Sequence, residues 1–364
     1  MVIITGYHHR KTITGYHHQT IITGYHHLTM SKMKIHDTTA FRRYVRVSPE
    51  QFDYLLSLMR HRLQKHPHGR PALESAHRLA ITLRYLASGS YLSSVAYSLR
   101  VGFTTIKRIV YETCTALWEE LMPIYLPNPT PEVWAQSAVH FEERWAFPNC
   151  LGAVDGKHIV IEAPKHGGSM FYNYKGSHSM GHGSGVTLLM AVADASYRFL
   201  FVDIGAYGSQ SDGCIFKACT LGRDIEAGGL GLPAPRALPG SSLEAPYVFM
   251  GDEAFQLRPD FMRPFPGTDL DDTRRVYNTR LSHARRCVEN AFGILASRWR
   301  IFRRPLNVKV ENVEFLVQAS IVLHNFLRAQ EEAAPGGETY CPPVVCSVMH
   351  FVPESVHELY YDKG

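Results

Sequence analysis

Three acidic residues stand at positions where their charge could do chemistry. Asp155 follows the apolar run LGAV, and Asp252 follows YVFMG, so each aspartate comes after a segment typical of a buried strand. Glu289 lies in a helical segment, where it is the only acid among nine arginines between residues 273 and 305. Because desolvating a carboxylate costs free energy, acids in such places either cap turns or hold a cation.

The two aspartates predict a metal site if their strands are neighbours. Two carboxylates side by side cannot both stay ionised unless a cation lies between them. Oxygen ligands of this kind match a hard divalent cation, Mg²⁺ or Mn²⁺. Gly251 would leave room for that ion, and Glu253 would add a further charge. Turn capping is the alternative for both aspartates.

The segments that must position these acids predict an α/β fold with a mixed sheet. Three strands are expected in close succession, followed by a helix that begins at Ser211 or Asp212 and a fourth strand that ends at Asp252. The short connections between the first strands make the sheet mixed and not purely parallel. The segment with Glu289 is expected to be a helix over residues 280–302.

Residues 48 to 122 have helical periodicity. Ser48, followed by a proline, is a typical N-cap, and Gly89 is expected to end the next helix. Ala96, Val101 and Ile106 then have the five-residue spacing of a helix-turn-helix.

A helix-turn-helix at this place would present Lys107 and Arg108 to DNA. A plain helical hairpin is the alternative, because Arg100 stands where the turn usually has glycine. The DNA contact is therefore a hypothesis.

Composition places the chain among ordinary globular proteins. It has 364 residues, 45% of them hydrophobic and 20% charged, and a net charge of +5 that does not by itself argue for nucleic acid. The basic stretch at 273–305 is a candidate phosphate-facing surface, with a solvated helix face as the alternative. The sequence has no apolar run of about 18 residues, so no membrane span is predicted. Seven cysteines without a CxxC pair indicate reduced thiols in an intracellular protein.

The chain divides into five expected parts. TGYHH occurs three times, at 5–9, 14–18 and 23–27, which fits a translated DNA repeat ahead of the first domain. The parts are a repeat-bearing N-terminus (1–30), a helical domain (45–126), a linker with a helix (127–147), a catalytic core (148–328) and a tail without a readable motif (329–364).

With the three acids in place, the chain resembles the PIF/Harbinger transposases and Harbinger transposase-derived nucleases, which are DDE superfamily endonucleases. The similarity is detailed from Cys150 to Arg328 and looser back to Ser48. It rests on six motifs in order: LGAVDGKHI, FYNYKGSHS (171–179), a glycine-rich turn (Gly205, Gly208, Ser209, Asp212), GDEAF, RLSHARRCVENAFG, and LHNF (323–326).

The resemblance implies an RNase H-like core, preceded by the small all-helical domain. It implies that Asp155, Asp252 and Glu289 bind two divalent cations and act in hydrolysis of DNA phosphodiesters, with strand transfer as a further activity. We expect DNA contacts at Lys107, Arg108, Lys157, Lys175, Arg280, Arg285 and Arg286.

Several of these residues have a structural alternative. Lys157 is equally a solvated lysine near a strand end, and Asp212 an N-cap. His324 and Asn325 are expected to face the core of a helix and not to act in catalysis.

DNA and a Myb-like protein are the partners that the resemblance implies. In this family the Myb-like protein binds the element ends and assists nuclear entry, so we expect the chain in the nucleus and also in the cytoplasm. Whether the protein forms a homo-oligomer is left open. The alternative to an enzyme is a domesticated, catalytically idle adaptor that binds DNA or a partner and keeps its acids as relics.

Overall fold

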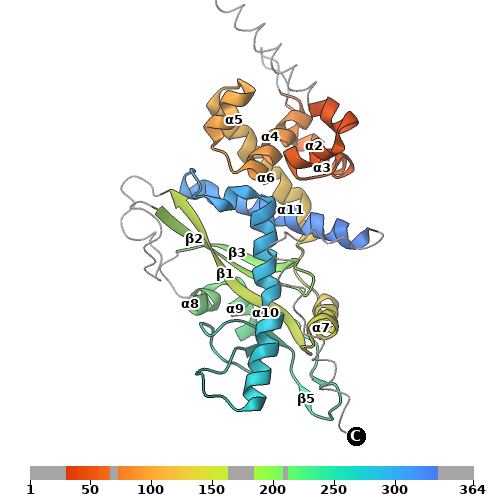
Figure 1. The fold of residues 1–364 in the computed structure, drawn as a ribbon, viewed down its shortest axis with the longest axis vertical. Helices are drawn as coiled ribbons and strands as arrows, with labels where there is room; N and C mark the ends of the chain where they lie inside the picture. Colours follow the sequence, from red (N-terminus) through yellow and green to blue (C-terminus); the bar gives the residue numbers. More distant parts are fainter. Residues whose placement is uncertain (1–29, 66–72, 163–183, 208–211, 335–364) are drawn as a thin grey trace, which may run out of the picture.

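The fold is built on a five-stranded mixed sheet. The computed structural model describes residues 30–65, 73–162, 184–207 and 212–334 (Figure 1). The strand order is β3-β2-β1-β6-β7. The strands are β1 Cys150–Glu162, β2 Ser184–Ala193, β3 Phe199–Tyr207, β6 Val248–Met250 and β7 Phe261–Met262. β1, β2 and β3 pair antiparallel, whereas β6 is parallel to β1 and β7 to β6, so the predicted mixed α/β class is confirmed.

The connection between β2 and β3 is a tight turn held by Asp194. Asp194 is buried there, and its Oδ1 accepts hydrogen bonds from the backbone N–H of Ser196 at 2.8 Å and of Arg198 at 2.9 Å. The Arg198 guanidinium also contacts the other Asp194 oxygen at 2.8 Å. An aspartate that bonds to the backbone just ahead of it holds a tight turn, which keeps β2 and β3 in one antiparallel pair.

Helices cover both faces of the sheet. One face packs against α7 Pro131–Trp145, α8 Asp212–Ala218 and α9 Thr220–Glu226. The other packs against α10 Asp272–Arg298 and α11 Val313–Ala333. α10 is longer than the predicted helix and runs across β1 (Figure 1). This helix is the element that brings Glu289 to the sheet.

Helices precede the sheet as predicted. They are α2 Thr38–Val45, α3 Pro49–Leu63, α4 Ser75–Ser88, α5 Leu92–Leu99 and α6 Phe103–Tyr125. Ser48 caps α3 in a capping box with Gln51, and Gly89 ends α4 in the left-handed conformation at φ 66°. Arg100 adopts φ 50° in the turn between α5 and α6, so a non-glycine residue takes the left-handed conformation where glycine is usual.

A separate N-terminal helical domain is not confirmed. α11, from the far end of the described chain, packs along α6, and one continuous hydrophobic core contains residues of α2–α6, α10 and α11. Figure 1 shows α11 lying between the N-terminal helices and the sheet. α11 also runs to Ala333, past the expected boundary after Arg328. The other domain boundaries stay predictions.

The remaining elements are short. A small hairpin of β4 Arg236–Ala237 and β5 Glu244–Ala245 lies in the Gly/Pro-rich segment, and two 3₁₀ turns, η2 Arg300–Arg303 and η3 Val310–Asn312, connect α10 to α11. Cys114, Cys150, Cys219 and Cys287 are buried free thiols. Across the described ranges, helices with the length and apolar character of a membrane span are absent.

Candidate active site

Asp155 lies on one of two adjacent strands, and Asp252 lies just after the other. Ala153 of β1 pairs in parallel with Met250 of β6. Each aspartate follows its paired residue by two positions, Asp155 within β1 and Asp252 in the turn just after β6, so the two acids come from neighbouring places in the sheet. The predicted neighbourhood of the two strands is thus confirmed in the strand order.

α10 covers one face of the sheet at this place. Ala153 and Met250 belong to the core cluster that includes Leu281 and Val288 of α10. Glu289 follows Val288 directly and is exposed, so it stands at the edge of this packed surface. The three acids therefore approach one region from two strands and one covering helix.

The electrostatics of Asp155 show that the acids act on one another. Burial raises the pKa of Asp155 to about 7, the Arg285 guanidinium and a backbone hydrogen bond at Gly156 oppose that rise, and the charges of Asp252 and Glu289 add to it. A carboxyl that is costly to ionise beside two further acids is the situation that a bound cation relieves.

Glu289 is paired with an arginine of its own helix. Arg285 Nη2 lies 2.5 Å from Glu289 Oε1, one turn earlier in α10. Among the described residues, no group of three or more His, Cys, Asp or Glu side chains is close enough to hold a metal ion. The donor set fits a hard divalent cation by its chemistry, with Glu289 drawn toward Arg285.

Lys157 belongs to the same surface. It follows Asp155 by two residues on β1, and its ammonium lies 5.7 Å from the centre of the Phe292 ring of α10. Burial lowers the pKa of Lys157, and the charge of Asp155 opposes that shift. A lysine held here against an aromatic ring is not the solvated strand-end residue of the alternative interpretation.

The other expected DNA contacts lie in different places. Arg280 and Arg286 are partly buried on α10, whereas Lys175 lies outside the described residues. Lys107 lines a hollow with Glu162, at the end of β1 away from Asp155, and Arg108 lies 4.0 Å from Glu112. The structure therefore gathers Lys157 and Arg285 around the acids and keeps Lys107 and Arg108 apart from them.

The turn that carries Asp252 is braced from both sides. Asp252 Oδ1 accepts a hydrogen bond from Ala254 N at 2.9 Å, so one oxygen caps the turn, and Oδ2 has no hydrogen-bond partner in the described part of the chain. Arg263 donates to the carbonyls of Glu253 and Phe255, both at 3.1 Å. Asp252 can therefore cap the turn and also bind a metal ion, because capping uses only one of its two carboxylate oxygens.

The predicted role of Gly251 is wrong. A Cβ at this position would lie 2.7 Å from Phe255 and 2.9 Å from Phe261, so the missing side chain makes room for two packed rings. These phenylalanines belong to the cluster on the opposite face of the sheet from α10. Gly251 allows close packing beneath the turn and does not face the acids.

His324 and Asn325 have the core role that the sequence predicts. His324 Nε2 donates to the Tyr197 carbonyl at 2.7 Å, and burial lowers the pKa of this histidine to about 3. Asn325 Nδ2 donates to the carbonyls of Phe199 at 2.7 Å and Tyr125 at 2.8 Å, and its Oδ1 accepts from Phe199 N at 2.9 Å. The LHNF motif therefore fastens α11 to β3 and to the end of α6.

Two positioning residues, Asn149 and Arg236, were not predicted from the sequence. Asn149, with φ 57°, accepts from Arg236 Nε at 2.7 Å and donates to the Ala245 carbonyl at 3.0 Å, while its own carbonyl accepts from Val248 N at 2.8 Å. These contacts fix the start of β6 beside the start of β1. An asparagine just before an apolar run is a weak signal for a left-handed residue, and the sequence offered no signal for its partner.

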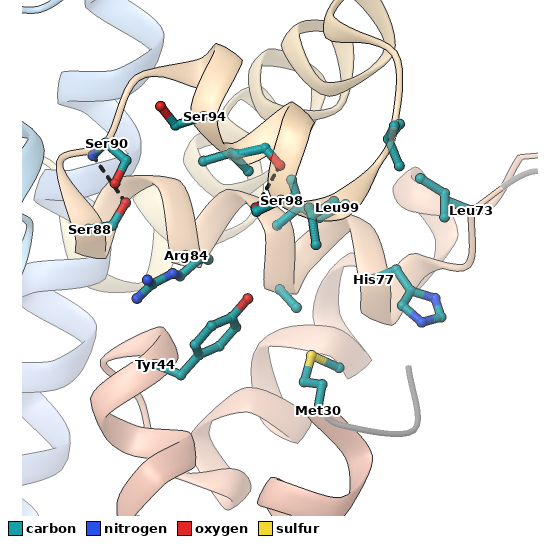
Figure 2. A pocket seen from close by; sticks show the side chains of 14 residues that line it. Met30, Tyr44, Leu73, His77, Arg84, Ser88, Ser90, Ser94, Ser98 and Leu99 are labelled. Carbon is teal, nitrogen blue, oxygen red and sulfur yellow. Dashed lines mark hydrogen bonds between the residues drawn. The ribbon is translucent and has the colours of Figure 1, made fainter. Parts of the chain in front are cut away.

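A pocket of about 270 Å³ lies elsewhere, between α2, α4 and α5 (Figure 2). Arg84 and His77 are basic residues in its lining, which contains no acid. The Arg84 guanidinium lies 4.5 Å from the centre of the Tyr44 ring. This pocket shares no residue with the three acids or with Lys157 and Arg285.

Comparison with known families agrees with this site. Residues 154–325 match the family described as DDE superfamily endonuclease, a range that contains all three acids. This stretch is similar to the DDE superfamily endonuclease domain. The mixed sheet of the domain and its covering helices are consistent with a DDE nuclease fold.

Curated relatives extend the similarity beyond the domain. Protein ALP1-like from Arabidopsis thaliana is 26% identical over 312 residues, which cover 81% of this chain and 72% of the relative. "Putative nuclease HARBI1" from Homo sapiens is 24% identical over 284 residues, which cover 76% of this chain and 74% of the relative. These relatives are Harbinger transposase-derived, so the resemblance seen in the motifs is confirmed. No solved structure matches the chain significantly.

Proposed function

We propose that this protein is a metal-dependent DNA endonuclease of the DDE type, in which Asp155, Asp252 and Glu289 hold two divalent cations. One observation carries the proposal: Asp155 on β1 and Asp252 just after β6 each follow by two residues the paired residues Ala153 and Met250, which pack against the helix that contains Glu289. The match of residues 154–325 to DDE superfamily endonucleases supports DNA as the substrate.

The chain's own residues have separable parts in the proposed reaction. When bound, Mg²⁺ or Mn²⁺ supplies an activated water or 3′-hydroxyl and stabilises the leaving oxygen of the phosphodiester. Asp155 and Asp252 supply carboxylates fixed by strand pairing, and Glu289 supplies a third from α10. Lys157, Arg285 and the neighbouring Arg280 and Arg286 hold DNA phosphates, which is a sequence-independent and salt-sensitive contribution.

The proposal extends to the surroundings of the reaction. Lys107 and Arg108 at the start of α6 bind duplex DNA, a Myb-like protein assists binding and nuclear entry, and the protein acts in the nucleus. We also propose that the core has an RNase H-like fold.

Cleavage of plasmid DNA tests the enzymatic proposal. We expect the protein to nick DNA with Mg²⁺ or Mn²⁺, and Asp155→Asn, Asp252→Asn and Glu289→Gln each to reduce the rate at least about 100-fold. Glu253→Gln is the matched control beside Asp252, because Glu253 is exposed and outside the proposed ligand set, and its rate should stay within about twofold.

Two results would contradict the proposal. Unchanged cleavage by Asp252→Asn would exclude this site as the source of the activity. A wild-type protein that binds DNA and cleaves with neither metal would favour the catalytically idle adaptor instead.

A further inference from the structure

We infer that Arg285 is a positioning residue: it is the counter-cation of the acidic site in the metal-free protein and is displaced from Glu289 when a divalent cation binds. The inference rests on the proposed metal site. It adds a competition between a resident arginine and the cation, which neither the family nor the relatives' names describe.

The contact of Arg285 differs from the ion pairs near the start of α10. Arg274 and Arg275 pair with Asp271 and Asp272, all four side chains being 56% or more exposed. Arg285 is only 24% exposed and reaches Glu289 at 2.5 Å. A short pair with a partly buried arginine is stronger than an ordinary exposed pair at helical spacing.

The part of α10 that carries Arg285 also packs on the sheet. Val288, one helical turn after Arg285, belongs to the core cluster with Ala153, which stands two residues before Asp155 on β1. With Lys157 on the same face, two cations oppose three carboxylates in the metal-free protein.

This arrangement makes the arginine and the cation competitors. A divalent cation close to Glu289 would repel the guanidinium, and Glu289 Oε1 cannot serve both at its best geometry. Moving the guanidinium away frees its planar set of donors on the surface where the proposed DNA phosphates lie. Cation binding would thus convert Arg285 from a partner of Glu289 into a phosphate ligand.

The competition can be measured without any nuclease assay. Binding of Mn²⁺ alone is followed by titration for the full chain and for Arg285→Gln, Arg285→Lys and Arg275→Gln. Arg275 is the matched control, because it forms an exposed ion pair with Asp272 on the same helix and lies outside the proposed site. We expect Arg285→Gln to bind Mn²⁺ about tenfold more tightly than wild type, whereas Arg275→Gln stays within about twofold.

Thermal unfolding in EDTA gives the second readout. Arg285→Gln should melt several degrees below Arg275→Gln, since the acidic site loses its counter-cation, and added Mn²⁺ should remove that difference. A merely structural arginine would not be replaced by a metal ion. Arg285→Lys keeps the charge and should bind Mn²⁺ about as wild type does. If Arg285→Gln is unfolded in EDTA, recovery of folding with Mn²⁺ supports the inference, and failure to recover contradicts it.

The outcomes separate this inference from the proposed function. A wild-type protein that binds no Mn²⁺ would overturn the proposed metal site and the displacement with it. A wild type that binds Mn²⁺, with Arg285→Gln equal or weaker, would overturn only the role of Arg285.

Discussion

At the scale of single residues, the ionisation of Asp155 is coupled to the stability of the fold. Burial and two neighbouring acids raise the pKa of this carboxyl from 3.8 to about 7. The unfolded chain therefore releases the proton near pH 4 and the folded chain near pH 7. Between these values the folded state binds more protons, so the stability of the metal-free protein falls as pH rises and stays low above pH 7.

Asp155→Asn should remove this dependence. In EDTA at pH 8 we expect the variant to be more stable than wild type by on the order of 1–2 kcal/mol, after allowing for partial exposure of the site. The difference should become small near pH 4, where Asp155 is protonated in the folded state and about half protonated in the unfolded chain, so the pH series contains its own control. Melting temperatures across pH 4–8 check this, and a constant offset between the two proteins would contradict it.

At the scale of elements, the positions of the three acids depend on the contacts that hold the strands and helices together. Arg263 braces the turn after β6, and Tyr277 of α10 donates to the Arg263 carbonyl at 3.2 Å. α10 is thereby tied to the turn that carries Asp252 as well as to the face that carries Asp155. The site is held by contacts that are far apart in the sequence.

The hydrogen bonds of Asn325, which hold α11 to β3 and to the end of α6, offer the clearest test of these contacts. It makes three hydrogen bonds, with Phe199 and Tyr125, and is buried. Asn325→Ala leaves these backbone groups without partners, so we expect a loss of about 2–4 kcal/mol in the free energy of unfolding, measured in urea. Gln318→Ala on the exposed side of α11 is the control and should change it by less than about 0.5 kcal/mol. Equal effects of the two variants would contradict the role of Asn325.

The start of α6 is testable as a DNA-binding element. Replacing Lys107 and Arg108 by alanine should weaken binding of duplex DNA and reduce the salt slope by about 2, if each side chain contacts one phosphate. Lys34→Ala is the control, because Lys34 pairs with Asp53 on another helix. If neither the affinity for duplex DNA nor its salt dependence changes, the α5–α6 unit is a helical hairpin without a DNA contact.

At the scale of the whole molecule, the N-terminal helices and the sheet share one core. Phe326 of α11 stacks on Tyr54 of α3 at 5.6 Å and meets Tyr125 of α6 edge-on at 5.3 Å. Elements from both ends of the described chain thus pack as one layer. Such packing favours a single cooperative unfolding transition.

A fragment of residues 30–126 should therefore fail to fold alone. Its α6 would expose the apolar face that α11 covers. Circular dichroism of the fragment should show little cooperative melting, whereas calorimetry of the full chain should show one main transition. An independently folded fragment would instead support a separate helical domain.

The sequence predicted elements better than their long-range contacts. Ser48 and Gly89 are local signals, and each was placed correctly because capping acts within a few residues. The sequence left the adjacency of the strands before Asp155 and Asp252 as a condition, which the observed strand order meets. The surroundings of Gly251, the Arg263 brace and the packing of α11 on α6 depend on residues distant in sequence, which no local pattern encodes.

A crystal structure grown with Mn²⁺ would show the proposed site itself, because anomalous scattering locates the ion. We expect Mn²⁺ bound by carboxylate oxygens of Asp155, Asp252 and Glu289, with Arg285 turned away from Glu289. Mn²⁺ bound elsewhere, or a site still closed by the Arg285–Glu289 pair at saturating metal, would contradict this expectation.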